Sequence, residues 1–200
     1  MNAATATHPR PEPRTARLVT DAFEPKNWIV LVTILIGWNA DRLAGIGWGL
    51  VGAVFAAVIP VVFINHGAKK GRWTDRHVGV RRQRVTVMAF ILASVGAGIA
   101  LLAGLGAPRS VIAMIIAMTA TLAGLLTVTV AWKISIHSAI ASGAVAMLAL
   151  AYGPWMLTGY LLVAAVAWSR IALRHHTPAQ VLAGACLGAA LAPLVFAVLR

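Results

Sequence analysis

The chain has 200 residues, of which 60% are hydrophobic and only 11% are charged, whereas a globular chain carries about 25% charged residues. Seventeen Lys and Arg stand against five Asp and Glu, so the net charge is +12. So few carboxylates exclude Asp-rich magnesium sites and EF-hand loops, and the lone Cys186 excludes an intrachain disulfide and a thiolate zinc site. The composition predicts a polytopic helical membrane protein.

Residues 1–26 contain four prolines and mixed charges and lack the apolar core of a signal peptide. We expect them to form a disordered or interfacial cytoplasmic tail, followed by a single transmembrane domain over 27–200. Seven apolar stretches make up that domain: 27–43, 46–64, 86–106, 110–131, 134–152, 154–170 and 178–199.

A spanning helix needs about 20 residues, and most of these stretches are long enough. The first is the weakest, because Asn39, Asp41 and Arg42 crowd its end, so it either spans or lies in the interface. The predicted fold is an all-α integral membrane protein, a bundle of six or seven short transmembrane helices.

Glycines indicate where helices turn and where they pack. Tyr152-Gly153-Pro154 interrupts an apolar run that would be far too long for one spanning helix, and Gly-Pro predicts a tight hairpin there. The GxxxG pairs Gly45/Gly49 and Gly184/Gly188 favour close contact between helices.

The positive charges are distributed unevenly between the two ends of the helices. With alternating helix directions, fourteen of the seventeen Lys and Arg fall on one face, and only Arg42, Arg109 and Arg200 fall on the other. By the positive-inside rule the cation-rich face is cytoplasmic. We therefore expect a multi-pass protein of the cell membrane with this face inside.

Five of the six histidines lie in three cation-rich segments, 66–84, 132–138 and 169–180, which share the cytoplasmic face by helix parity. Ionisable groups near lipid are costly and usually functional. Histidines and cations with few carboxylates suit an anionic ligand, of which phosphate is the leading candidate.

The last of these segments reads Ser169-Arg170, five residues, His176 and then Thr-Pro-Ala-Gln180. It resembles the third signature of the type-2 phosphatidic acid phosphatase superfamily, in which Ser-Arg, five residues, His, three residues and Asp follow one another. Ile134-Ser135-Ile136-His137 resembles a degenerate form of the second signature, Pro-Ser-Gly-His. The run from Lys69 to Arg76-His77 is similar to the first, Lys, six residues, Arg-Pro. The resemblance covers roughly residues 65–195.

The resemblance implies a membrane lipid phosphatase or pyrophosphatase that acts on a phosphatidate or polyprenyl phosphate type of substrate. His176 would be the nucleophile that forms a phosphohistidine, and His137 would protonate the leaving oxygen and then activate water. The phosphoryl oxygens would be bound by Arg170, Arg76, Lys69 and Ser135. Arg84 is a further phosphate-binding candidate. No metal or other cofactor is required.

This chain departs from the signatures at two positions. Gln180 replaces the Asp that would orient the nucleophile. Its amide could fix the tautomer of the His176 ring, or it could belong to a capping box over Thr177–Gln180. The two roles are compatible. Arg76 lacks the following proline, and Lys133, two residues before Ser135, rivals Lys69 as the phosphate-binding lysine.

Other functions remain in competition with the hydrolase. A catalytically degenerate relative would bind lipid phosphate headgroups or a partner protein, and a phosphotransferase on the same fold would pass the phosphoryl group to an alcohol. A transporter comes third, because no inverted repeat is evident. The expected partners are a lipid phosphate or diphosphate and membrane phospholipids, with no nucleic acid, while the sequence leaves a homo-oligomer open.

Overall fold

The structure, a computed structural model, describes residues 13–71 and 81–200; in the helix that begins at Arg81 the side chains are described from residue 86 onward, except residue 88. These residues form helices and turns and no strand, which confirms the all-α prediction. The elements are α1 (Arg14–Ala22), α2 (Pro25–Ala53), the π-helical η1 (Val54–Val58), α3 (Ile59–Lys69), α4 (Arg81–Gly104), α5 (Arg109–Ala131), α6 (Ile136–Tyr152), the 3₁₀ helix η2 (Pro154–Gly159), α7 (Tyr160–Ala172) and α8 (Pro178–Leu199).

Four helical segments of the described chain are long and apolar enough to cross a membrane. They are Pro25–Lys69, Arg109–Ala131, Pro154–Ala172 and Pro178–Leu199. Two shorter apolar helices, Ala89–Gly104 and Ile136–Tyr152, accompany them.

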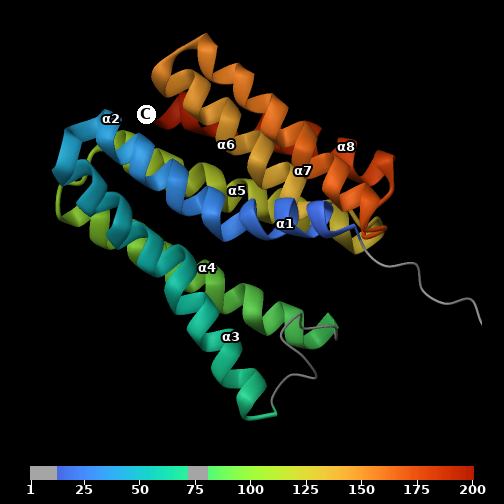
Figure 1. The fold of residues 1–200 in the computed structure, drawn as a ribbon. Coiled ribbons are helices and arrows are strands. Elements are labelled where there is room, and N and C mark those ends of the chain that lie inside the picture. Colours follow the sequence, from blue (N-terminus) through green and yellow to red (C-terminus); the bar gives the residue numbers. More distant parts are fainter. Residues whose placement is uncertain (1–12, 72–80) are drawn as a thin grey trace, which may run out of the picture.

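The longest of these segments folds back on itself near the middle of α2. Asp41 and Arg42 leave the helical conformation, and Arg42 has a φ of 48°, a left-handed value that few non-glycine residues adopt. Beyond this turn the chain runs antiparallel to residues 25–40, with the backbones of Gly37 and Gly45 in direct contact (Figure 1). The predicted division near residues 43–46 is therefore confirmed.

A second tight turn joins α6 to α7 and confirms the predicted hairpin. Gly153 has a φ of 105°, which glycine adopts without the steric cost of a Cβ, and Pro154 begins η2. Across this hairpin the Ser142 hydroxyl donates a hydrogen bond of 3.3 Å to the Tyr160 hydroxyl.

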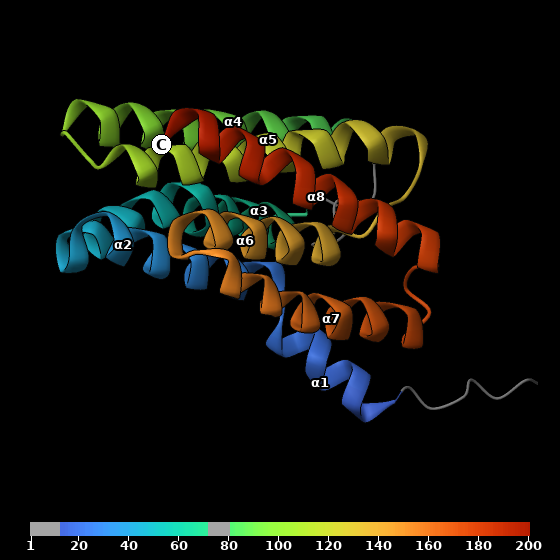
Figure 2. The same ribbon diagram turned by 90° about the horizontal axis from the view of Figure 1, so that it is seen from above.

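The centre of the bundle is α6, whose residues from Ser138 to Leu148 are buried. It packs against α2, α5, α7 and α8 (Figures 1 and 2). Its contact with α8 is a backbone contact, because Gly184 lies against the Ser135 carbonyl and Gly188 against the Ala139 carbonyl. The Gly184/Gly188 pair therefore has the packing role that its spacing predicts.

The α3–α4 pair diverges from α6, α7 and α8 toward the end of the bundle at which α6 and α8 begin (Figure 1). Phe63 of α3 stacks on Phe90 of α4 with 3.8 Å between ring centroids, in an apolar cluster separate from the main core. Farther along α4, Val95 and Leu102 join the main core. The first half of α4 thus packs mainly on α3.

Part of the predicted tail, 1–26, is an ordered helix. Residues Arg14–Ala22 form α1, which packs against α7 (Figure 2). Ala16 and Thr20, four residues apart, share its buried face, and the Thr20 hydroxyl donates a hydrogen bond of 3.0 Å to the Ser169 hydroxyl. Residues 1–12 lie outside the described part of the chain.

We expect Gly188→Ala to destabilise the protein by about 1–3 kcal/mol, because the new Cβ would overlap the Ala139 carbonyl and push α8 away from α6. The matched control is Gly96→Ala in α4, where nothing lies within 4 Å of the added Cβ. Unfolding of both variants in detergent checks the prediction, and equal stabilities would contradict it.

Candidate functional site

The starts of α6 and α8 lie side by side and form the floor of the candidate site. Ser135 caps α6 and Thr177 caps α8. The Ser135 backbone N–H donates a hydrogen bond of 3.1 Å to the Gln180 carbonyl, which joins the two helix starts. Two helix N-termini, each with a partial positive charge, therefore meet at one place.

Arg170 lies beside them in the last turn of α7 and is only 9% exposed. Its carbonyl accepts hydrogen bonds from the backbone N–H groups of His175 (3.1 Å) and His176 (3.3 Å), so it also anchors the loop that leads to α8. Its guanidinium Nε is buried and has no hydrogen-bond partner among the described residues. Buried polar atoms without partners are rare in proteins and call for an explanation.

His176 follows in the same loop, with its ring partly buried. The Nδ1 atom is buried and has no hydrogen-bond partner in the described structure. Burial lowers the pKa of His176, and the positive charges of Lys133 and Arg170 lower it further, against a smaller opposing effect of the Gln180 side chain. The ring is therefore neutral at neutral pH and carries the lone pair that a nucleophile needs.

Lys133 and His137 complete the group of basic side chains. The exposed Lys133 donates a hydrogen bond of 3.2 Å from Nζ to the His175 carbonyl. His137, in the first turn of α6, interacts electrostatically with Arg170 and His176. The structure thus brings together His176, His137, Arg170 and Lys133 from two predicted segments.

Gln180 belongs to the predicted capping box. Its side-chain oxygen accepts a hydrogen bond of 3.1 Å from the Thr177 N–H, and its own N–H donates one of 3.3 Å to the Thr177 hydroxyl. A side-chain hydrogen bond with Gln180 raises the pKa of the His176 ring, against the larger lowering effects of burial and the cations, but Nδ1 of that ring has no hydrogen-bond partner within the described chain. The capping role is confirmed, and the structure shows no bond to Nδ1 that fixes the tautomer.

Ser135 is fully buried beneath the basic group. Its Oγ accepts hydrogen bonds from the Ser138 N–H (3.4 Å) and from the Ser138 hydroxyl (3.0 Å). This side chain therefore serves as the cap of α6.

Lys69, the described residue of the first signature, is not brought to this site. Lys69 is exposed at the end of α3, in the helix pair that diverges from α6–α8 (Figure 1). Arg76 lies outside the described residues, and the side chain of Arg84 is not among those described. Between the rival lysines, Lys133 is the one that contacts the His176 loop.

Glu24 is a carboxylate that the sequence analysis did not place near the site. It lies in the corner between α1 and α2 and interacts electrostatically with His137. One signal was available: Glu24 lies three residues before the first apolar stretch, on the cation-rich face.

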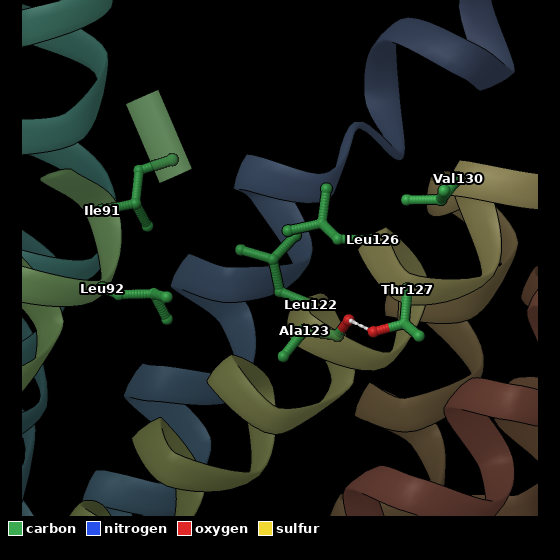
Figure 3. A pocket seen from close by; sticks show the side chains of 7 residues that line it. All are labelled: Ile91, Leu92, Leu122, Ala123, Leu126, Thr127 and Val130. Atoms are coloured by element: carbon green, nitrogen blue, oxygen red, sulfur yellow. Dashed lines mark hydrogen bonds between the residues drawn. The ribbon is translucent and has the colours of Figure 1, made fainter. Parts of the chain in front are cut away.

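Two apolar hollows lie among the helices that carry the site and their neighbours. A cavity of about 140 Å³ is lined by residues of α2, η1, α4, α5 and α6, including Pro25 and Ile136. A groove of about 420 Å³ lies between α4 and α5 (Figure 3) and is lined by Ile91, Leu92, Leu122, Ala123, Leu126, Thr127 and Val130. Ile91 and Leu122 line both spaces, so the cavity and the groove are neighbours.

No protein-family model, curated protein or solved structure matches this chain. The function of the site has therefore to be inferred from its own residues and their arrangement.

We expect Lys133→Gln to move the titration of His176 to higher pH, because removing this positive charge relieves part of the depression of its pKa. Burial, the larger cause, remains, so the recovery is incomplete. Arg174→Gln, at an exposed position of the same loop, is the matched control. NMR of ¹⁵N-histidine-labelled protein measures both, and equal movement in the two variants would contradict the assignment to Lys133.

Proposed function

We propose that this chain is a divergent member of the type-2 phosphatidic acid phosphatase superfamily that hydrolyses a phosphate ester or diphosphate of a lipid through a phosphohistidine. One observation carries the proposal: the buried Nε of Arg170 and the buried Nδ1 of His176 lack partners within the described chain, at a place where two helix N-termini and Lys133 concentrate positive charge. A phosphate group would supply acceptors for Arg170 and the electrophile for His176.

In the first step, a ring nitrogen of His176 attacks phosphorus. The N–P bond forms as the bond from phosphorus to the leaving oxygen breaks, and His137 donates a proton to that oxygen. In the second step, His137 accepts a proton from water, whose oxygen attacks phosphorus and releases phosphate and His176. Arg170, Lys133 and the backbone N–H groups at the start of α8 stabilise the charge on the phosphoryl oxygens.

The apolar hollows support a lipid substrate. With the phosphate at His176, the hydrocarbon chain would enter the cavity beside Ile136 and continue into the groove between α4 and α5 (Figure 3). The apolar lining favours a hydrocarbon occupant over a polar one.

The proposal includes a multi-pass location in the cell membrane with six or seven spans. Residues 25–40 would cover about 24 Å as a helix, less than the roughly 30 Å hydrocarbon core. The number of spans is seven if this segment crosses the membrane and six if it does not. The cation-rich end, which carries the site, is proposed to face the cytoplasm.

A second candidate function is phosphate-headgroup binding without turnover. It is favoured by Gln180, whose side-chain oxygen is engaged in the cap of α8 and which cannot stabilise an imidazolium as a carboxylate does. Tight binding of a lipid phosphate by the wild-type protein, with no release of phosphate, would support this function over hydrolysis.

We expect His176→Ala to lower phosphate release from lipid phosphates on the order of 10³-fold or more, because it removes the nucleophile. His175→Ala, which changes the exposed neighbouring histidine, should leave the rate close to wild type. Phosphate release by purified protein in mixed micelles, assayed across lipid monophosphates and diphosphates, measures both. Unchanged release in His176→Ala would refute the mechanism.

We expect Ala123→Trp to lower kcat/KM for a long-chain lipid phosphate about tenfold, a loss of roughly 1.4 kcal/mol of chain binding, because the indole would fill the groove that Ala123 lines (Figure 3). A short-chain, water-soluble analogue should be hydrolysed as by wild type. Ala197→Trp, at an exposed position of α8, is the control. Equal losses for both chain lengths would argue against the groove as the chain site.

A further inference from the structure

Helix α1 is fixed to the start of α2 by hydrogen bonds and an aromatic contact. The Asn27 side chain donates from Nδ2 to the carbonyls of Asp21 (3.3 Å) and Ala22 (2.9 Å), at the end of α1, where helix carbonyls lack partners within their own helix. The ring of Phe23 lies 5.8 Å from that of Trp28, centroid to centroid, and Trp28 belongs to the main core. The position of α1 therefore follows that of the bundle core.

On its other side, α1 meets the last turn of α7. The Thr20 hydroxyl donates a hydrogen bond of 3.0 Å to the Ser169 hydroxyl, which itself donates one of 2.7 Å to the Val166 carbonyl. Thr20 is 9% exposed, and Ser169 is fully buried. Ala16, one turn before Thr20, is buried on the same face of α1. The bond thus lies in a packed contact, where a polar group that loses its partner is costly.

Helix α7 lies at the edge of the bundle. Its buried residues, Val163, Val166, Ser169 and Arg170, follow one side of the helix, while Trp168 and Ile171 are exposed. Within the described chain it packs against α6, α8, the preceding η2 and α1 (Figure 2). Because η2 lies at its opposite end, α1 is one of three helices that can hold its last turn.

This last turn carries both groups on which the proposed phosphate site depends. The guanidinium of Arg170 extends from it, and the Arg170 carbonyl accepts the hydrogen bonds from the N–H groups of His175 and His176. A shift of the turn would therefore move the guanidinium and the His176 loop together. Hydrogen bonds and one peptide link connect Thr20, through Ser169, to both.

We propose that Thr20 is a positioning residue for the candidate site: through Ser169 it holds the last turn of α7 and thereby fixes Arg170 and the His176 loop. This role rests on the proposed phosphatase function. It makes α1, which the sequence assigns to a tail, a part of the site. A displacement of about 1 Å can cost on the order of 10²-fold in rate, so the loss of this bond should be measurable in turnover.

A purely structural bond would affect stability and leave the site unchanged. Thr20→Val removes the hydroxyl and keeps the branched shape of the side chain. The matched control is Thr121→Val in α5, where the hydroxyl of a threonine that is 2% exposed donates a hydrogen bond of 2.8 Å to the Ala117 carbonyl. Both variants lose a buried hydroxyl, but only Thr20 contacts α7 next to Arg170.

The first measurement follows the ring signals of His176 by NMR in detergent-solubilised, ¹⁵N-histidine-labelled protein without substrate, assigned by His176→Gln. We expect Thr20→Val to shift or broaden these signals, and Thr20→Ser, which retains the hydroxyl, to keep them close to wild type. Thr121→Val should leave them unchanged. Unchanged signals in Thr20→Val, or the same change in Thr121→Val, would overturn the proposal.

The second measurement is kcat/KM for phosphate release from phosphatidate and from a polyprenyl phosphate in mixed micelles, using whichever wild type hydrolyses faster. We expect Thr20→Val to lower kcat/KM about tenfold, Thr20→Ser to restore most of it, and Thr121→Val to match wild type. Since Ser169→Ala removes the acceptor, adding Thr20→Val to it should lower the rate little further. Fully additive losses would overturn the action through Ser169.

The two measurements distinguish this proposal from the proposed function. If wild type is active and Thr20→Val matches it, the positioning role is wrong and the hydrolase function stands. If wild type releases no phosphate from either lipid, the hydrolase function fails, while the His176 signals still decide whether Thr20 fixes the loop.

Discussion

Backbone contact between α6 and α8 is the constraint on which the rest of the site depends. Gly184 and Gly188 place α8 directly against the carbonyls of Ser135 and Ala139, and the hydrogen bond from the Ser135 N–H to the Gln180 carbonyl aligns the two helix starts. Helices in a membrane associate through close packing more than through a hydrophobic driving force. Because Gly184 and Gly188 have no side chains, the α8 backbone can lie directly against the α6 backbone. The relative position of His137 and His176 follows from it, because each residue lies within the first turn of its helix or just before it.

The same junction concentrates positive charge at the candidate site. Two helix N-termini, Arg170 and Lys133 converge where few carboxylates are present, and the guanidinium of Arg170 is largely removed from water. Taking such a cation out of water is unfavourable unless an anion or hydrogen-bond acceptors compensate. A dianionic phosphate would provide that compensation.

The sequence predicted those features that local signals control. The break at Gly153-Pro154, the capping box at Thr177–Gln180 and the grouping of His137, Arg170 and His176 depend on spacing within short segments, or on helix parity, and the structure has them. The position of Lys69 and the contribution of α1 could not be predicted in this way. The first depends on how far the α3–α4 pair diverges from the bundle, and the second on a contact between Thr20 and Ser169, residues 149 positions apart.

One feature of the packing links the departure from the first signature to the apolar groove. The first half of α4 packs mainly on α3, around Phe63 and Phe90. This part of α4 is therefore separated from α5 by the groove that Leu92 and Leu126 line (Figure 3). The same divergence carries the end of α3, and Lys69 with it, away from the His176 loop. With the helices arranged in this way, a lysine at the end of α3 cannot reach the proposed phosphate site. Lys133, which follows α5, bonds to the His176 loop, so under the proposed function it would supply the positive charge that Lys69 cannot bring there.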